Sequence, residues 1–584
     1  MLVRSPRRAP PRRAPLRILL IAGSFNSLTQ RVHTALRDED HSVAVHLVHG
    51  DEPLREAVRA TDPDLIVAPM LTSVVPEDIW STRTVLIVHP GPKGDRGPSS
   101  LDWAIHEGAA DWGVTVLQAA AEMDAGDIWA SVPFRVAPCG KSELYRGEVS
   151  DAAVRAVLLA VERFASGTFV PEPLDYTAPD VRGRLRPPLR QDVRRIDWEH
   201  DDTATVLRKL RAADSRPGVL DELYGEAYFL HGGHPEDELR GAPGTVLATR
   251  DGAICRATSD GAVWIPQLRP RRVPGGPVTV KLSAARVLGE RLAGVPEVGV
   301  DPVAAADRET WSEIRYRELG RAGFLEFSFA GGAMCTGRCR RLLAAYRAAC
   351  ARPTSVLVLG PRRDFFSNGI HLGVIETAAH PGDESWENIN AMDDLVHAVL
   401  STTDRLTVAA LPGNAAAGGL MLALAADEVW CRDGAVLNPH YRLMGLYGSE
   451  YWTYTLPRRV GTAEAERLTS RPLPVSAQHA ADLGLIDRVL PGGQAEFRAE
   501  VELRAAALAG AAELPERVTL KRSGREREEA ERPLDAYRLD ELARMKQNFF
   551  GDGEPYPVLR REFVHGVRPG STPGHLTAWL PAGA

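Results

Sequence analysis

Residues 85–98 of this chain read VLIVHPGPKGDRGP. The run Val85–His89 is apolar up to its last residue and leads directly into a loop of prolines and glycines, a pattern typical of a buried parallel strand. In sheets of this kind, ligands bind beyond the carboxyl ends of the strands. We therefore expect His89 to point into a ligand crevice, with Gly91 and Gly97 letting the loop backbone approach the ligand closely.

The sequence around this stretch alternates short apolar runs with amphipathic segments. Stretches such as Leu28–Arg37 and Pro53–Ala60 have a helical pattern and separate the apolar runs. Alternation at this spacing predicts a layered α/β domain with a largely parallel sheet. The predicted strands are Arg17–Ala22, Ser42–Val48, Leu65–Ala68, Val85–His89 and Gly113–Gln118.

Length, composition and charge exclude several classes of protein. The chain has 584 residues, of which 44% are hydrophobic, and 70 Lys+Arg against 77 Asp+Glu leave a net charge of −7. This is ordinary globular composition, without the basic field that nucleic-acid binding requires. No apolar run reaches the roughly 18 residues of a membrane span. Six cysteines in so long a chain make no disulfide framework, which indicates a cytoplasmic protein.

The chain divides into segments of different texture. Residues 1–15 are rich in Arg and Pro and are expected to form a disordered basic lead. We expect a first buried strand rather than an export signal after them, because the apolar run is short and is interrupted by Arg17. We predict an α/β domain over 16–180, a small β-barrel-like subdomain over 181–285, a helical connector over 286–320, a second α/β domain with a helical C-terminus over 321–565, and a loose tail over 566–584.

A carboxylate completes the first candidate site. Asp124 follows the predicted strand Gly113–Gln118. There it is placed to orient the His89 imidazole and to stabilise its charged form, which suits proton transfer beside an acyl centre. Taken singly, the two residues also fit a buried structural histidine and a turn aspartate. Together they predict a catalytic pair.

These motifs resemble the formyltransferases that use 10-formyltetrahydrofolate, such as methionyl-tRNA formyltransferase. The likeness rests on His89 before the Pro/Gly loop, on residues 113–115 (GVT) and on residues 124–126 (DAG), and covers roughly the first 280 residues. It implies a Rossmann-like fold and a folate substrate. The family's Asn two residues before the histidine is Ile87 here, so the oxyanion donor must come from elsewhere.

A second polar loop follows the first predicted strand. Residues 26–31 read NSLTQR. A helix N-cap is one interpretation of this loop. We also predict that Gln30 and Arg31 lie near the folate or a second substrate.

Two glycine turns in the second half form another candidate site. Residues 365–372 (FFSNGIHL) and 410–420 (ALPGNAAAGGL) each free a main-chain N–H that can polarise a thioester carbonyl. Either turn alone is equally typical of a loop that feeds a buried helix. Together they resemble the crotonase (enoyl-CoA hydratase/isomerase) superfamily. The resemblance assigns the two donors to the N–H groups of Ile370 and Gly418, with Gly369 in the turn that binds the acyl-CoA.

The catalytic acids of the hydratases do not map onto this chain. One position falls on Met421 and the other on His440. Because Met421 can move no proton, water addition is disfavoured. Tyr441 and Glu450 stand nearby, in the segment that lines the crotonase pocket. We predict that His440, Tyr441 and Glu450 move protons there; a surface loop with aromatic packing is the alternative.

The phosphates of coenzyme A need cations. Arg338 and Lys521 are candidates in the second domain, although Arg-rich helix faces are usually only solvated. Cys335 and Cys339 are spaced like metal ligands, but no second ligand pair accompanies them. We therefore predict no metal site.

Both halves in this order resemble the HypX/HoxX family of hydrogenase maturation factors. The likeness rests on residues 89–105, which include Arg96, Gly97 and Trp103, and on residues 445–452 (GLYGSEYW). It implies formyl transfer from 10-formyltetrahydrofolate to coenzyme A, then decarbonylation of formyl-CoA to carbon monoxide for the iron of a [NiFe]-hydrogenase. It also implies that Arg96, Gly97 and Trp103 help to bind the cofactors, and that contact with hydrogenase assembly proteins is transient, with no nucleic acid and no membrane.

Two alternatives stay open at this point. One is a formyltransferase for an amino sugar or tRNA, with a non-catalytic acyl-CoA-binding domain. The other is a maturation scaffold without catalysis, with which Met421 is compatible. The isoleucine at position 87 and the character of the second half count against the first alternative.

Overall fold

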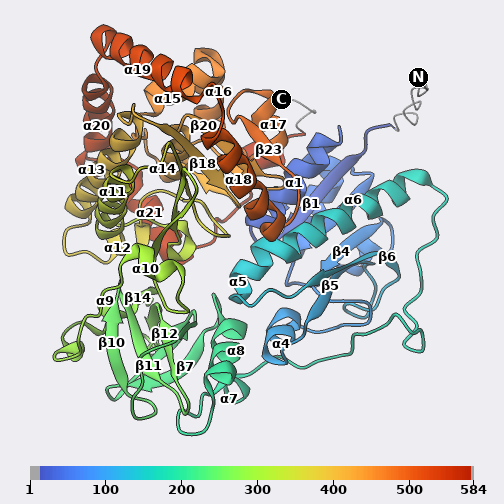
Figure 1. Cartoon of the computed structure of the whole chain (residues 1–584). Helices are drawn as coiled ribbons and strands as arrows, with labels where there is room; N and C mark the ends of the chain where they lie inside the picture. The colour runs from blue at the N-terminus through green and yellow to red at the C-terminus, as the bar shows by residue number, and fades with distance from the viewer. Residues whose placement is uncertain (1–13, 580–584) are drawn as a thin grey trace, which may run out of the picture.

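The structure is a computed structural model that describes residues 14–579. It consists of two α/β domains that contact each other and a smaller β-rich subdomain that lies below the second α/β domain in the view of Figure 1. Residues 1–13 of the predicted basic lead and residues 580–584 of the predicted tail lie outside the described range. Over 14–579, no helix combines the length and the hydrophobicity needed to cross a bilayer.

The first domain is a six-stranded sheet covered by helices on both faces, and its strand order is β2-β1-β3-β4-β5-β6. Strands β2, β1, β3 and β4 are parallel to one another. Strand β5 pairs antiparallel with β4, and β6 pairs antiparallel with β5. The strands are β1 (Arg17–Ala22), β2 (Ser42–Leu47), β3 (Leu65–Met70), β4 (Val85–His89), β5 (Asp111–Gln118) and β6 (Ile128–Arg135). The helices are α1 (Ser27–Asp38), α2 (Asp51–Thr61), α3 (Glu77–Trp80), α4 (Ser100–His106), α5 (Lys141–Leu144) and α6 (Ser150–Ser166), with a π-turn at Tyr145–Val149 between the last two.

Alternating side chains of the strands explain this layering. Ile18 and Leu20 of β1 pack in one core with helices α1 and α6, and Leu19 and Ile21 pack in another with α2 and α3. A strand buried on both faces reads as one continuous apolar run, which is why all five predicted strands form. Strand β6 was not predicted. The predicted α/β class with a largely parallel sheet is confirmed.

The β-rich subdomain contains two four-stranded sheets, ordered β10-β11-β12-β9 and β14-β13-β8-β7. Helices α7 (Gln191–Arg194) and α8 (Thr203–Ala213) precede them. The strands are β7 (Val219–Leu223), β8 (Glu226–His231), β9 (His234–Glu236), β10 (Val246–Arg250), β11 (Ala253–Ala257), β12 (Ala262–Ile265), β13 (Gln267–Pro270) and β14 (Leu282–Ser283). The predicted helical connector is helical only in part, at α9 (Ala284–Leu288), a 3₁₀ turn (Gly289–Leu292) and α10 (Pro302–Ala306), because its last residues begin the next sheet.

The second α/β domain has a six-stranded sheet, ordered β15-β16-β17-β18-β20-β23, and a small sheet β19-β21-β22. Only β15 runs antiparallel to its neighbour in the larger sheet. The strands are β15 (Ile314–Leu319), β16 (Ala322–Phe327), β17 (Val356–Gly360), β18 (Leu406–Leu411), β19 (Ala415–Ala416), β20 (Glu428–Arg432), β21 (Val436–Asn438), β22 (Val475–Ser476) and β23 (Arg488–Leu490).

Helices surround this sheet and form the C-terminal part of the chain, as predicted. They are α11 (Thr336–Cys350), α12 (Leu372–Glu376), α13 (Pro381–Leu400), α14 (Gly418–Leu424), α15 (Trp452–Val460), α16 (Thr462–Ser470), α17 (Ala477–Asp482), α18 (Gln494–Ala509), α19 (Leu514–Glu531), α20 (Leu534–Phe550), α21 (Tyr556–His565) and α22 (Gly574–Thr577).

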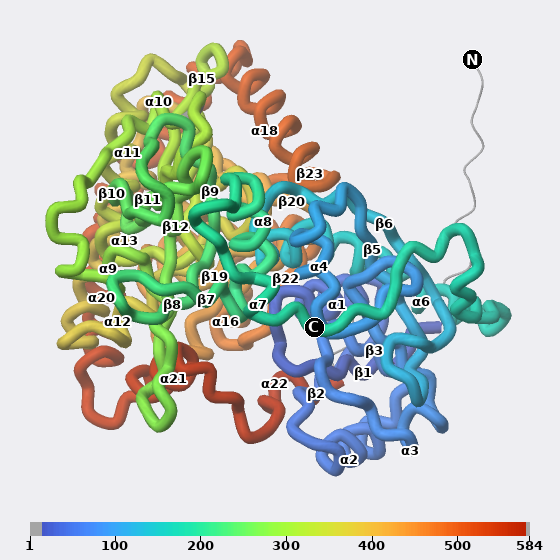
Figure 2. Tube along the Cα trace, turned by 90° about the horizontal axis from the view of Figure 1, so that it is seen from below, coloured from blue at the N-terminus to red at the C-terminus, as the bar shows by residue number. Residues whose placement is uncertain are grey.

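The last helix returns to the first domain, and Figure 2 shows α22 beside β2. Leu576 of α22 is buried in the core of the first domain. The hydroxyl of Thr572 accepts a hydrogen bond of 2.9 Å from the Leu47 amide. The prediction of a loose tail is therefore wrong for these residues, because one buried leucine and a hydrogen bond from the β2 backbone to the Thr572 hydroxyl anchor them.

A buried ion cluster joins the two α/β domains. Asp151, at the start of α6, lies 2.6 Å from the Arg31 guanidinium of α1 and 3.1 Å from that of Arg432 in β20. Burial alone would raise the pKa of Asp151, but the two arginines together lower it below its ordinary value. Beside this cluster, Arg146 binds the carboxylate of Asp364 through both of its oxygens.

We predict that Asp151→Ala destabilises the protein by about 3–5 kcal/mol, because it leaves two buried guanidinium groups without their shared carboxylate. Urea unfolding followed by circular dichroism measures the change. As a matched control, Asp111→Ala removes a carboxylate from a pair with the exposed Arg135, and should cost less than about 1 kcal/mol. Equal unfolding midpoints for the two variants would contradict the role of the cluster.

Candidate functional site

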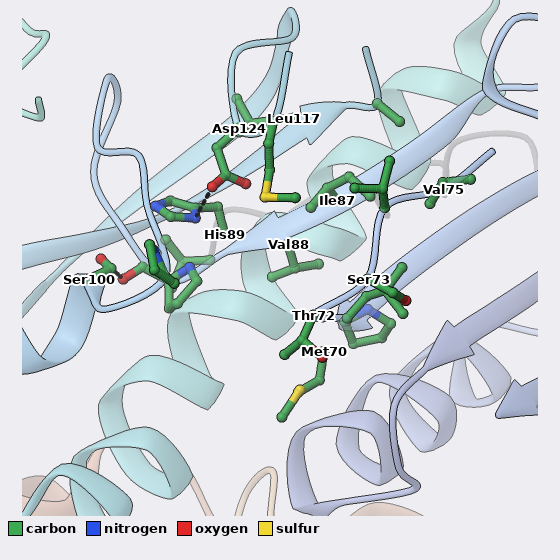
Figure 3. A pocket seen from close by; sticks show the side chains of 18 of the residues that line it. Met70, Thr72, Ser73, Val75, Ile87, Val88, His89, Ser100, Leu117 and Asp124 are labelled. Atoms are coloured by element: carbon green, nitrogen blue, oxygen red, sulfur yellow. Dashed lines mark hydrogen bonds and ion pairs between the residues drawn. The ribbon is translucent and has the colours of Figure 1, made fainter. Parts of the chain in front are cut away.

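His89 ends strand β4 and has a carboxylate at each ring nitrogen. Its side chain is 5% exposed; Nε2 lies 3.0 Å from Oδ2 of Asp95, and Nδ1 lies 3.5 Å from Oδ2 of Asp124. Asp124 enters from the loop after β5, and Figure 3 shows the His89 ring and the Asp124 carboxylate pointing toward each other. The two residues predicted as a pair are thus in contact.

Asp95 contacts the predicted His89 and was missed by sequence reasoning. Its side chain is fully buried, and its second oxygen accepts a hydrogen bond of 2.7 Å from Arg186, which lies 91 residues further along the chain. This arrangement leaves Nδ1 as the ring nitrogen on the Asp124 side. A Cβ on Gly91 would overlap both the His89 ring and Asp95, so only glycine fits the loop there.

A cavity of about 360 Å³ opens in front of the pair. His89, Gly97 and Asp124 are among its polar wall, and Ile87 stands in its apolar wall. Most of the other lining side chains are apolar or aromatic, including Met70, Val75, Trp80 and Leu117. The cavity therefore combines one ionisable pair with a broad apolar surface.

Three of the other residues predicted to contact a cofactor, Gly91, Arg96 and Trp103, do not line this cavity. Arg96 pairs with Glu122 at 2.5 Å and donates to the carbonyl of Met123, which braces the loop that carries Asp124. Trp103 donates its indole N–H to the carbonyl of Pro187 at 2.8 Å. Gly97, in contrast, lies at the cavity as predicted.

The second domain holds a cavity of about 480 Å³, and both predicted main-chain donors lie at it. A backbone bridge between Ser367 and Ala415 aligns the two glycine turns. A Cβ on Gly369 would stand 3.4 Å from the Gly418 nitrogen, so the turns are closely apposed. Gly418 is the first residue of α14, where an N–H has no partner within the helix and carries the positive end of the helix dipole.

Glu450 lies against this pair of turns. It is 1% exposed, and a Cβ on Gly418 would overlap its carboxyl group. The Tyr441 hydroxyl donates to Oε2 of Glu450 at 2.8 Å. Burial, with the negative charge of Asp393 in second place, raises the pKa of Glu450 to about 8. Burial also raises the pKa of Tyr441 well above its ordinary value, so its proton stays on at neutral pH.

His440 is the third predicted proton carrier at this cavity. Its ring is buried, and both ring nitrogens are without a hydrogen-bond partner among the described residues. Burial, together with the neighbouring His575, lowers the pKa of His440 to about 4. The ring is therefore uncharged at neutral pH. Met421 is buried in the core and is not part of the cavity wall.

The first turn of α1 separates the two cavities. Leu28 lines the first cavity, and Ser27 and Gln30 line the second. The Gln30 side-chain carbonyl accepts a hydrogen bond of 3.1 Å from the Asn438 amide across the domain boundary. Gln30 thus lies at the second cavity rather than the first. Arg31 reaches neither wall, because it is bound to Asp151.

The two cations proposed for coenzyme A lie elsewhere. Arg338 is buried and pairs with Glu313 at 2.5 Å. Lys521 on α19 pairs with Asp427 at 2.6 Å. Neither residue lines either of the two cavities. Within residues 14–579, no three His, Cys, Asp or Glu side chains gather in a way that could hold a metal ion.

Comparison with known families divides the chain in the same way. Residues 48–161 match the formyl transferase family, residues 188–274 match the formyl transferase C-terminal domain, and residues 333–539 match enoyl-CoA hydratase/isomerase. The methionyl-tRNA formyltransferase of Ectopseudomonas mendocina is 26% identical over 41% of the chain and 74% of its own length.

Two relatives match nearly the whole chain. The hydrogenase maturation factor HoxX of Bradyrhizobium diazoefficiens is 49% identical over 96% of both proteins. The crystal structure of HypX from Aquifex aeolicus in complex with tetrahydrofolic acid is 43% identical, has a TM-score of 0.93, and covers 96% of this chain and 98% of that one. The order and relative placement of the domains are therefore shared.

We predict that the protein loses stability as the pH rises toward 8, and that Glu450→Gln flattens this loss. The ordinary pKa of a glutamate is 4.5, whereas folded Glu450 has a pKa of about 8. Between these two pH values, Glu450 is protonated in the folded state and ionised in the unfolded state. Its contribution to the free energy of unfolding is therefore fully present below pH 4.5 and is lost as the pH rises through the folded pKa. Thermal melts from pH 5 to 8.5 measure the slope.

Glu387→Gln is the matched control for this measurement, because Glu387 on α13 has a 59% exposed side chain and pairs only with the exposed Arg340. The melting temperature of Glu387→Gln should fall with pH as steeply as that of the wild type. A Glu450→Gln variant whose melting temperature falls as steeply with pH as that of the wild type would contradict the burial-driven shift.

Proposed function

This chain belongs to the family of the hydrogenase maturation factors HoxX and HypX, and we propose that it makes carbon monoxide for the iron of a [NiFe]-hydrogenase. In the first step a formyl group passes from 10-formyltetrahydrofolate to the thiol of coenzyme A. In the second step formyl-CoA is split into carbon monoxide and coenzyme A. The observation that carries the proposal is the arrangement of two different reactive cavities on opposite sides of the first turn of α1.

The first cavity suits a folate. Its apolar wall offers a surface for a flat ring system, and tetrahydrofolic acid is bound to the Aquifex aeolicus relative. His89 takes the proton of the attacking thiol, and Asp124 stabilises the imidazolium that results. The proton then passes to the folate nitrogen as its bond to the formyl carbon breaks. Asp95, held by Arg186, fixes the ring so that its other nitrogen performs this transfer.

The second cavity suits an acyl thioester. The N–H groups of Ile370 and Gly418 hold the formyl oxygen. The Glu450 carboxylate takes the formyl proton while the carbon–sulfur bond breaks, and Tyr441 gives its proton to the departing thiolate. Because Tyr441 is hydrogen-bonded to Glu450, the acid returns the proton to the phenol and both groups are restored. A pKa near 8 keeps both forms of Glu450 available near neutral pH.

Coenzyme A supplies a thiol at the end of a long flexible arm. Of the predicted coenzyme A contacts, Gln30 and Gly369 lie at the second cavity, whereas Arg338 and Lys521 are engaged in ion pairs away from it. The unpartnered ring nitrogens of His440 at the same wall are further polar contacts for a bound thioester. Holding the thiol beside both cavities replaces a bimolecular encounter by a positioned one.

A scaffold without catalysis is the main alternative, and one feature counts against it. A purely structural role gives no reason to bury Glu450 against the two main-chain donors at a cost in stability. A formyltransferase for tRNA or an amino sugar, with a non-catalytic second domain, has the same difficulty. One assay separates the proposed function from both alternatives: the protein, 10-formyltetrahydrofolate and coenzyme A are mixed, and carbon monoxide is detected with a haem reporter.

We predict that His89→Ala lowers the rate of carbon monoxide formation from 10-formyltetrahydrofolate by about 10²–10⁴-fold, which is the usual contribution of general acid–base catalysis. Supplied formyl-CoA should still be split at the wild-type rate, because His89 acts only in the first step. His200→Ala, at a histidine whose side chain is 83% exposed, should leave both rates unchanged. An unaffected rate in His89→Ala would remove this residue from the mechanism.

We predict the opposite pattern for Glu450→Gln. Formyl transfer, measured as loss of 10-formyltetrahydrofolate with excess coenzyme A, should continue, while carbon monoxide release from formyl-CoA should fall by about 10²–10⁴-fold. Glu387→Gln, on the exposed face of α13, serves as the control that keeps both activities. Carbon monoxide release from formyl-CoA at the wild-type rate in Glu450→Gln would refute the assignment.

A further inference from the structure

The segment that carries Glu450 has an unfavourable backbone conformation. Glu450 and Tyr451 have φ angles of 61° and 60°, so two consecutive non-glycine residues adopt the left-handed conformation. In this conformation the Cβ atom crowds the following carbonyl oxygen, which is unfavourable for residues other than glycine. Such pairs persist only where the surrounding structure determines them, and they cluster at active sites.

Two buried carboxylates from different helices hold this segment. Oδ1 of Asp393, on α13, accepts hydrogen bonds from the Glu450 amide at 2.9 Å and from the Ser449 hydroxyl at 3.0 Å. The Glu541 carboxylate, on α20, accepts hydrogen bonds from the Tyr451 amide at 2.9 Å and the Thr453 amide at 2.8 Å. The backbone N–H groups of both left-handed residues therefore donate hydrogen bonds to buried carboxylates.

Both carboxylates are fully buried, and that of Asp393 is only partly hydrogen-bonded. Asp393 and Glu541 are both 0% exposed. Oδ2 of Asp393 has no hydrogen-bond partner among the described residues, and its nearest cation is Arg538, whose Nε lies 3.8 Å away. Burying a carboxylate in this state costs stability. This loss of stability is explained if Asp393 and Glu541 hold Glu450 in place.

We propose that Asp393 and Glu541 are positioning residues for Glu450, which fix the left-handed pair so that the Glu450 carboxyl group lies against the Gly418 turn. This inference rests on the proposed role of Glu450 in the second step. The position of Glu541 supports it, because residues 333–539 match enoyl-CoA hydratase/isomerase and Glu541 lies just beyond them. Part of the support for the reactive acid thus comes from outside the matched crotonase region.

Several titratable and charged groups surround the Glu450 carboxyl group. Asp393 faces it from α13, Glu541 and the cation Arg538 from α20, Cys339 from α11, and Tyr441 from the loop after β21. Burial and then the Asp393 charge raise the pKa of Glu450, and burial likewise raises that of Glu541 to about 8. Removing the Asp393 charge should therefore let Glu450 lose its proton at a lower pH.

The test is to titrate the Glu450 carboxyl group in the full-length protein. Its protonation is measured by infrared difference spectroscopy, with the Glu450→Gln variant as the reference. Asp393→Asn keeps an acceptor for the Glu450 amide but removes the charge, and should lower the Glu450 midpoint by about one pH unit. The pH profile of carbon monoxide release from formyl-CoA should move by the same amount. Asp540→Asn, at a carboxylate with a 76% exposed side chain next to Glu541, should move neither.

A second variant tests the positioning itself. Asp393→Ala removes the acceptor, so we expect kcat for formyl-CoA to fall at least tenfold with little change in KM, and Asp393→Asn to restore most of it. If Asp393→Ala does not fold, Glu541→Gln takes its place, since it weakens the hold on the Tyr451 amide without changing the size of the side chain. A residue that acts only on stability would lower the melting temperature and leave the pH profile in place.

The outcomes separate this inference from the proposed function. An unmoved Glu450 midpoint and a kcat within twofold of the wild type would overturn the positioning role, even in a protein that makes carbon monoxide. A shifted midpoint in a protein that makes none would keep the positioning role and reject the proposed second step.

Discussion

The shared carboxylate of Asp151 is the interaction on which the two-site arrangement depends. It binds Arg31 of α1 and Arg432 of β20, and all three groups lie between the two α/β domains. Since the first turn of α1 lines both cavities, fixing α1 to the second domain also fixes the distance between them. A hinged connection between the domains could not hold a flexible substrate arm in reach of both sites.

Much of the fold follows from local sequence patterns. The strands of the first sheet are predictable because each is buried on both faces and reads as an apolar run, as Val85–His89 does. Strand β6, in contrast, has an exposed proline and arginine among its residues and mixes buried with exposed positions, so its pattern is weak. The anchored tail is also hidden from the sequence, because it depends on one leucine docking into a domain more than 500 residues earlier.

The candidate sites were predictable where a motif places the residue on a strand end or a glycine turn. His89, Asp124, Ile370 and Gly418 lie at the cavities for that reason, whereas Glu450 was predicted from the resemblance of its segment to the lining of the crotonase pocket. Asp95 and Asp393 were missed because their roles come from partners brought close only by folding, namely Arg186 and the Glu450 amide. Arg338 shows the opposite error, since a cation chosen by its charge is in fact neutralised by Glu313.

The two cavities differ in the groups they present: the first holds an imidazole between carboxylates, and the second holds two main-chain donors and a buried acid. The proposed formyl transfer needs a group that gains and loses a proton beside a nitrogen and a sulfur atom, and His89 stands between two carboxylates where it can do so. Decarbonylation competes with attack by water, which would yield formate instead of carbon monoxide. The wall of the second cavity includes apolar residues such as Leu446 and Met545 beside its polar groups. In the proposed second step, burial strengthens the interaction of Glu450 and the two main-chain donors with the formyl group, and the stability lost by burying that acid is the cost of this reactivity.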